Sequence, residues 1–162
     1  MDYQLTNNGD TGIAVVGLGY VGLPTAIAFH KSGFRVIGID INSETIRMIA
    51  GRKSPLLDST TELEIPEISE TWELSTTFNG ILLETDVILI TVPTPVNEDK
   101  TPDLSLVRSA MKSVFSNIGN DQRVTVVLES TVYPGATMEI VEGIREELGS
   151  VFPRNIEIGY SP

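Results

Sequence analysis

Three glycines at fixed spacing are the first feature of this sequence with a clear chemical meaning. They follow the short apolar segment 13–16, and the run reads Gly17-Leu18-Gly19-Tyr20-Val21-Gly22. In such a motif between a strand and a helix, the first glycine permits a tight turn. The second lets the backbone approach a pyrophosphate, and the third lets helix and strand pack closely. The free N–H groups and positive dipole end of the helix can then hold the anion without a basic side chain.

An acidic residue, Asp40, stands eighteen residues after Gly22, where a predicted strand over 34–39 ends. A carboxylate at this place accepts hydrogen bonds from an adenosine ribose and repels a 2′-phosphate, so it favours NAD over NADP. The alternative is that Asp40 only caps a helix beginning near Asn42. The glycine motif upstream favours the ribose role.

Two later loops follow predicted strands and therefore lie at the same edge of a parallel sheet as the glycine motif. The first has two prolines that stiffen it, and it reads Val92-Pro93-Thr94-Pro95. By its residues alone it is equally an ordinary loop. The second loop reads Glu129-Ser130-Thr131-Val132-Tyr133-Pro134-Gly135. Its hydroxyls could contact a nicotinamide or position a water, and Ser130 and Thr131 could equally cap the helix that follows.

Composition narrows the classes of partner and of chemistry. The 162 residues include 11 basic and 22 acidic ones, a formal net charge of −11, so we expect neither nucleic acid nor an anionic membrane as a partner. The absence of cysteine excludes a disulfide, a thiolate zinc site and a cysteine nucleophile. We expect the single histidine, His30, on the surface without a partner. The sequence shows no metal-ligand spacing, and we predict no metal.

The order of the predicted elements indicates one domain. Residues 1–11 are polar and do not resemble a secretory signal, and no apolar run is long enough to cross a bilayer. We expect a polar tail over 1–11 and a domain over 12–162. The predicted strands lie at 13–16, 34–39, 74–78, 86–92, 124–128 and 156–159. Predicted helices cover 20–31, 42–50 (capped by Asn42 or Ser43), 104–118 (capped by Asp103 or Thr101) and a face over 141–148.

This alternation predicts an α/β fold, a doubly wound parallel sheet of the Rossmann type. Its ligand is expected at the carboxyl edge, between the first and fourth strands. The acidic stretch 58–73 breaks the rhythm and is interpreted as a solvated excursion with a little helix. We expect Trp72 to pack at the edge of that excursion.

Six segments, in this order, resemble a known family. They read VVGLGYVGLPTAIAF, VIGIDIN, ITVPTP, TPDLS, ESTVYPGAT and IGYSP. Together they resemble the amino-terminal, NAD-binding domain of the UDP-glucose/GDP-mannose dehydrogenases, over about Gly12 to Pro162. The ESTVYPG form is most similar to the branch acting on UDP-N-acetylhexosamines for bacterial surface polysaccharides such as capsule.

The resemblance implies roles for particular residues. Gly17 to Gly22 would cradle the NAD pyrophosphate, Asp40 would hold the adenosine ribose, Val92 to Pro95 would line the cofactor, and Ser130 to Val132 would reach its nicotinamide end. Thr131 is similar to the family threonine that helps hold a catalytic water. Where the family often has Arg or Lys, this chain has Thr45; Arg47 is near but is not the matching position.

The resemblance also implies what is missing. The family oxidises a sugar C6 alcohol to a carboxylate in two steps with two NAD, through a cysteine thiohemiacetal helped by a lysine and an asparagine. Those residues follow the Ser-Pro pair at which this chain stops. We therefore expect a fragment that is a monomer by itself and binds NAD without turnover. Its parent would be a cytoplasmic, homo-oligomeric UDP-sugar 6-dehydrogenase.

Two alternatives remain open from the sequence. One is a stand-alone NAD-sensing module, which would need no groups aimed at a nicotinamide. The other is the cofactor half of a phosphogluconate-type hydroxyacid dehydrogenase, which would have a different loop after the fifth strand.

Overall fold

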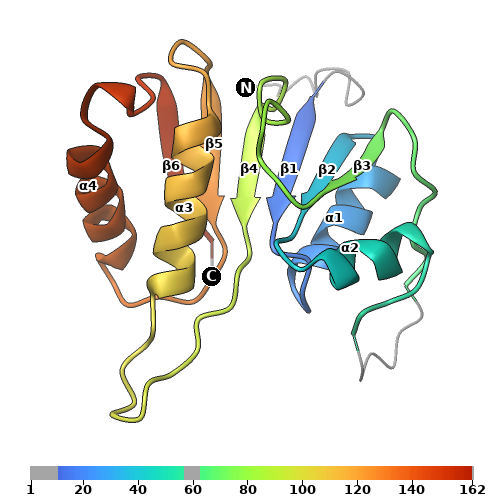
Figure 1. The fold of residues 1–162 in the computed structure, drawn as a ribbon, viewed down its shortest axis with the longest axis horizontal. Helices are drawn as coiled ribbons and strands as arrows, with labels where there is room; N and C mark the ends of the chain where they lie inside the picture. Colours follow the sequence, from blue (N-terminus) through green and yellow to red (C-terminus); the bar gives the residue numbers. More distant parts are fainter. Residues whose placement is uncertain (1–10, 57–62, 162) are drawn as a thin grey trace, which may run out of the picture.

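A six-stranded parallel sheet organises the residues described by the computed structural model, 11–56 and 63–161. The strands run in the order β3-β2-β1-β4-β5-β6 (Figure 1). Their bounds are β1 Gly12–Val16, β2 Arg35–Ile39, β3 Trp72–Ser75, β4 Val87–Ile90, β5 Val124–Leu128 and β6 Ile156–Tyr160. The predicted α/β, doubly wound class is confirmed.

The part of the chain that the structure describes contains four α-helices. Their bounds are α1 Gly22–Lys31, α2 Ser43–Ala50, α3 Ser105–Asn117 and α4 Ala136–Leu148, and a 3-10 turn follows at Gly149–Val151. The strand order reverses between β1 and β4, so the chain leaves these two neighbours in opposite directions. Such a reversal opens a crevice at the carboxyl ends of the strands. In Figure 1 those ends form the lower edge of the sheet, beyond which the loop from β4 to α3 extends.

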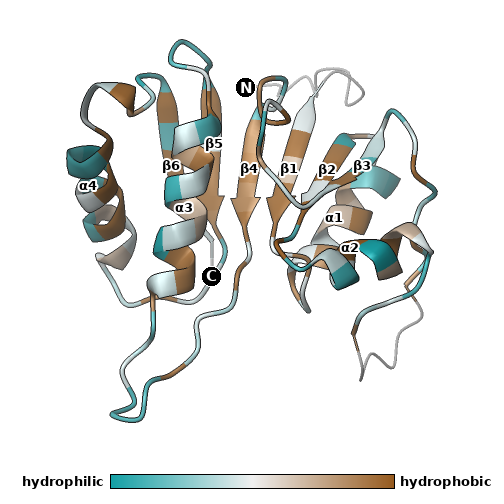
Figure 2. Cartoon of the chain, viewed as in Figure 1, coloured by the Kyte–Doolittle hydropathy of each residue, from teal (hydrophilic) through white to brown (hydrophobic). Residues whose placement is uncertain are grey.

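Side chains that alternate along the strands build two cores, one on each face of the sheet. On β1, Ala14 and Val16 belong to the core formed with α3 and α4, whereas Ile13 and Val15 belong to the core formed with α1 and α2. A strand covered on both faces must be apolar throughout. Figure 2 shows the central strands in the brown of hydrophobic residues, and the teal of hydrophilic residues on parts of α2, α3 and α4.

The starts of three helices test the caps that the sequence predicted. Asn42 caps α2, since its side chain accepts a hydrogen bond from the amide of Glu44. At α3 the N-cap is Leu104, with no side-chain cap, so the predicted cap at Asp103 or Thr101 is wrong. The Asp103 carboxylate nevertheless accepts from the amide of Ser105 at 2.9 Å. The helix α4 begins after Gly135, whose φ is 93°, with no side-chain cap. Capping by Ser130 or Thr131 is therefore wrong.

The prediction that His30 lies on the surface without a partner is also wrong. His30 is half-buried, its Nε2 lies 3.3 Å from Oγ1 of Thr71, and its ring lies edge-on to Trp72 with 5.3 Å between centroids. Trp72 is fully buried and opens β3, two residues before the predicted strand. The reason is topological: β3 pairs with β2, so the chain entering β3 passes the end of α1.

The acidic stretch is anchored to the fold more firmly than a solvated excursion would be. Ile65 is buried at 3% exposure, and Glu64 pairs with Lys31 of α1 at 2.6 Å. Residues 63–70 contain no helix. The part over 58–62 lies outside the described residues, as do residues 1–10 of the predicted tail over 1–11. No described helix is both long and apolar enough to span a membrane.

Candidate functional site

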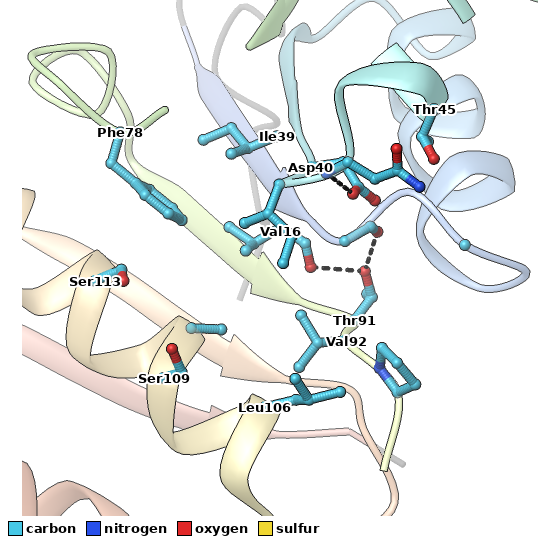
Figure 3. A pocket seen from close by; sticks show the side chains of 16 residues that line it. Val16, Ile39, Asp40, Thr45, Phe78, Thr91, Val92, Leu106, Ser109 and Ser113 are labelled. Carbon is cyan, nitrogen blue, oxygen red and sulfur yellow. Dashed lines mark hydrogen bonds between the residues drawn. The ribbon is translucent and has the colours of Figure 1, made fainter. Parts of the chain in front are cut away.

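Two adjoining pockets lie at the carboxyl edge of the sheet, where the loops after β1, β2, β4 and β5 meet. The first has a volume of 360 Å³ and lies between the loops after β1 and β2 and the helix α3 (Figure 3). The second, also 360 Å³, lies between the glycine loop and the loops after β4 and β5. Both pockets are lined by Gly19, Thr91, Val92 and Pro93. A long ligand can therefore run from one pocket into the other past the glycine loop.

The three glycines of the motif occupy different environments. Gly17 has a φ of 95°, in the left-handed region that favours glycine, and its amide donates to the carbonyl of Ile39 at 2.8 Å. A Cβ on Gly22 would lie 1.8 Å from the carbonyl oxygen of Gly17, so helix and loop touch there. A Cβ on Gly19 would meet nothing within 4 Å. Gly19 is thus the place where a ligand can reach the backbone.

Unpaired amides surround that open space. The backbone N–H groups of Gly19, Tyr20 and Val21 donate to no other residue in the described part of the chain. They directly precede α1, whose N-terminal end carries a partial positive charge. These two features make the loop suitable for an anion without a basic residue, in a chain with net charge −11.

Asp40 holds the glycine loop and lines the first pocket. Its Oδ2 accepts from the amide of Leu18 at 2.8 Å, and its Oδ1 accepts from the amide of Asn42 at 2.9 Å. Because Asn42 is the cap of α2, Asp40 is not merely a helix cap. A carboxylate has about four lone-pair sites, so acceptor capacity remains for a ligand hydroxyl.

The remaining walls of the first pocket come from segments far apart in sequence. Ile39, Phe78 and Leu106 supply apolar surface, and Ser109 and Ser113 of α3 supply hydroxyls (Figure 3). A slot with apolar walls and a few hydroxyls suits a flat heteroaromatic group. Thr45 also lines this pocket, whereas Arg47 pairs with Glu44 at 2.6 Å. At the position where the family often has a basic residue, this chain thus has the hydroxyl of Thr45 at the pocket.

Thr91, which sequence reasoning did not select, lies under the glycine loop. It is 8% exposed, and its Oγ1 lies 2.7 Å from the carbonyl oxygen of Gly17 and 3.0 Å from that of Val16. The added Cβ on Gly22 would also come within 2.4 Å of this Oγ1. The hydroxyl therefore links the end of β4 to the turn after β1. The sequence did carry one signal that could have identified Thr91: it is a polar residue directly after an apolar strand.

The second pocket is bounded by the loop after β5. Thr131 is exposed, and its hydroxyl has no hydrogen-bond partner among the described residues. The Ser130 hydroxyl, in contrast, donates to the carbonyl of Val92 and ties the β5 loop to the β4 loop. Glu129 lines the same pocket, and burial raises the pKa of its carboxyl above the usual value. The sequence patterns assigned no role to Glu129.

Most of the predicted site residues line one or both pockets. Those that do are Gly17, Gly19, Tyr20, Val21, Asp40, Val92, Pro93, Thr94, Ser130 and Thr131. Four others line neither pocket: Leu18, Gly22, Pro95 and Val132. Leu18 and Gly22 support the loop from behind, the Pro95 carbonyl accepts from the amide of Asp103, and Val132 packs on the core.

The arrangement fits a dinucleotide. The apolar slot of the first pocket suits a base, and the carboxylate at its rim suits a ribose. The free amides come next and suit a pyrophosphate. The second pocket, with its hydroxyls, suits a second nucleoside. Within 11–56 and 63–161, no group of three or more His, Cys, Asp or Glu side chains could hold a metal ion.

Comparisons with known proteins agree with this geometry. The model of the UDP-glucose/GDP-mannose dehydrogenase family, NAD binding domain, matches residues 11–162. The chain is 42% identical over 155 residues to the UDP-N-acetyl-D-glucosamine 6-dehydrogenase of Pseudomonas aeruginosa, with 94% of this chain and 35% of that protein covered. It is 40% identical over 151 residues to the CapL protein of Staphylococcus aureus, with 93% and 34% covered.

A solved structure is similar as well. A ternary complex of GDP-mannose dehydrogenase from Pseudomonas aeruginosa has a TM-score of 0.81 to this chain at 28% identity, with 91% of this chain and 35% of the other covered. The chain thus spans about a third of the length of these relatives.

Proposed function

Because the chain belongs to the UDP-glucose/GDP-mannose dehydrogenase family and matches its NAD-binding domain, we propose that it binds NAD for the oxidation of a UDP-N-acetylhexosamine at C6. The observation that carries the proposal is the pair of joined pockets around unpaired amides at Gly19, Tyr20 and Val21. The adenosine half lies in the first pocket and the nicotinamide half in the second. The printed names of the relatives supply the sugar class.

When bound, NAD supplies the acceptor for a hydride from the substrate carbon. The residues of this chain position and shield it. The free amides hold the pyrophosphate, Asp40 accepts from the ribose hydroxyls, and the apolar walls exclude water from the base. In the second pocket, the unpartnered Thr131 hydroxyl holds a water beside the nicotinamide end, and Ser130 fixes the loop that carries it.

The chain alone has no means of oxidising the sugar. It contains no cysteine to form a covalent intermediate, and hydride transfer depends on holding the substrate carbon against the nicotinamide. In the parent enzyme, which we place in the cytoplasm as a homo-oligomer, the product would enter bacterial surface polysaccharide. The family assignment argues against both a stand-alone NAD sensor and a phosphogluconate-type enzyme.

Calorimetric titration of the chain with NAD, followed by a turnover assay with UDP-N-acetylglucosamine, its galacto epimer and UDP-glucose, tests the proposal. We expect saturable NAD binding without NADH formation. Absence of NAD binding would refute the cofactor role. Turnover by the chain alone would refute the division of labour. The same assay on a full-length relative, which should prefer an N-acetylated sugar, tests the sugar class.

A further inference from the structure

One charged side chain, Glu129, is present among the described residues that line the second pocket. The amide of Glu129 donates to the carbonyl of Ile90 at 2.9 Å, which extends the β4–β5 ladder by one residue and fixes the backbone. Its neighbours Leu128 and Ser130 are buried, at 0% and 7% exposure. Glu129 itself is half-buried, so its side chain starts from a rigid position at the pocket wall.

The Glu129 carboxylate has no hydrogen bond or ion pair with any other described residue. Two other glutamates, in contrast, have cationic partners: Lys31 lowers the pKa of Glu64, and Lys112 and Arg108 lower that of Glu147. Burial without a cation instead raises the pKa of Glu129. A partly desolvated charge without a partner is costly, so a cation entering the pocket would be favoured there.

We propose that Glu129 makes the site prefer the oxidised nicotinamide over the reduced one. This inference rests on the proposed function, because it needs the nicotinamide half to lie in the second pocket. The two forms of the cofactor share the carboxamide, the riboses and the pyrophosphate, so contacts with those groups do not discriminate between them. They differ in ring charge, since the oxidised ring is a cation and the reduced ring is neutral.

A fixed carboxylate attracts the cationic ring, and the attraction is stronger in a partly desolvated pocket than in water. The preference suits a reaction that removes four electrons from one alcohol, because the first reduced cofactor must leave and a second oxidised one must enter. Glu129 acts on this exchange as a specificity-determining residue. No step of hydride transfer is assigned to it.

Titration of the chain with NAD⁺, NADH and ADP-ribose tests the inference on four proteins: wild type, Glu129→Gln, Glu129→Asp and Glu73→Gln. Glu73 is a half-buried glutamate on β3 at the far edge of the same sheet, so its replacement removes the same charge outside the pockets. We expect Glu129→Gln to lower the ratio of NAD⁺ to NADH affinity about tenfold, which corresponds to 1.4 kcal/mol. Glu129→Asp should retain most of the preference, and Glu73→Gln all of it.

ADP-ribose lacks the nicotinamide and should bind all four proteins alike, which also shows that the variants are folded. An unchanged NAD⁺ to NADH ratio in Glu129→Gln overturns the inference while leaving the proposed function intact. The inference is also overturned if Glu129→Gln lowers the affinities for NAD⁺ and NADH equally, or lowers the affinity for ADP-ribose. In either case the carboxylate would contact a group that these ligands share. Wild-type protein that binds neither cofactor overturns the proposed function and this inference with it.

Discussion

The Oγ1 atom of Thr91 lies 2.7 Å from the carbonyl oxygen of Gly17, across 74 residues of sequence. This contact joins β4 to the glycine loop at the point where the strand order reverses. The conformation of the glycine loop therefore depends on a hydroxyl that comes from the end of another strand. The same hydroxyl also occupies the space that a side chain on Gly22 would need.

Thr91→Val should therefore weaken both the fold and the cofactor site. Valine has the shape of threonine but no donor, so the Gly17 carbonyl loses a hydrogen bond and the free energy of unfolding falls by about 1–3 kcal/mol. NAD affinity should fall with it, because the loop amides are held less rigidly. Urea unfolding and calorimetry measure the two effects. Thr91→Ser keeps the hydroxyl and is the matched control; a valine variant as stable and as tight-binding as the serine variant would contradict the role.

Gly19 and Gly22 should respond to substitution in opposite ways. A side chain at Gly19 enters open space, so Gly19→Val should change the free energy of unfolding by less than about 0.5 kcal/mol. It should nevertheless lower NAD affinity by at least roughly tenfold, because the side chain occupies the place of the pyrophosphate. Gly22→Ala forces a methyl group against the Gly17 carbonyl and should destabilise the fold by about 1–3 kcal/mol or more.

Denaturant unfolding and NAD titration of both glycine variants separate these effects. If Gly19→Val binds NAD like wild type, the glycine run is only a turn, and the anion site at its free amides does not exist.

Asp40 should set the choice between NAD and NADP. A carboxylate at the rim of the first pocket repels a 2′-phosphate, so NADP should bind at least about tenfold more weakly than NAD. In Asp40→Asn the difference between the NAD and NADP affinities should become smaller. Both affinities are expected to fall there, since Leu18 and Asn42 donate to different oxygens of Asp40, and asparagine replaces one of these oxygens by an NH2 donor. The ratio measured by calorimetry is therefore the informative quantity, and equal affinities in wild type would disprove the role.

Glu129 should lower the free energy of unfolding at neutral pH. Its folded-state pKa is raised above the ordinary value of 4.5, so the folded protein binds this proton more tightly than the unfolded chain. The penalty is absent below the unfolded value and grows as the pH rises through the folded value. Glu129→Gln should thus raise the free energy of unfolding at about pH 7, by less than about 1 kcal/mol because water screens the half-exposed group.

The gain should disappear at about pH 4, where the carboxyl is largely protonated in both states. Glu157→Gln is the control, since Glu157 pairs with Arg123 at 2.9 Å and its replacement should not stabilise the fold. Urea unfolding of both variants at the two pH values measures the difference. If Glu129→Gln stabilises the fold equally at the two pH values, the charge of Glu129 is not the cause of the stabilisation.

The sequence by itself determined the alternation of strands and helices and the place of the glycine loop. These features depend on local properties: apolar runs that must be covered on both faces, such as residues 13–16, and backbone conformations that only glycine adopts readily, as at Gly17 with its φ of 95°. The place of Asp40 at the rim of the first pocket was predictable for the same reason, because its distance from the motif is set by one helix and one strand. Family resemblance of six segments then indicated the cofactor.

Tertiary structure alone decided which distant side chains complete the site. Phe78 and Leu106 become walls of one pocket, and Thr91 supports the turn at Gly17, only because the strand order places their segments together. His30 acquired its contacts with Thr71 and Trp72 in the same way, through the pairing of β3 with β2. Partners across many residues leave no local pattern, since packing and charge pairing depend on three-dimensional neighbours. The unpaired charge of Glu129 is of this kind: a glutamate is visible in the sequence, but its lack of a cation is visible only in the fold.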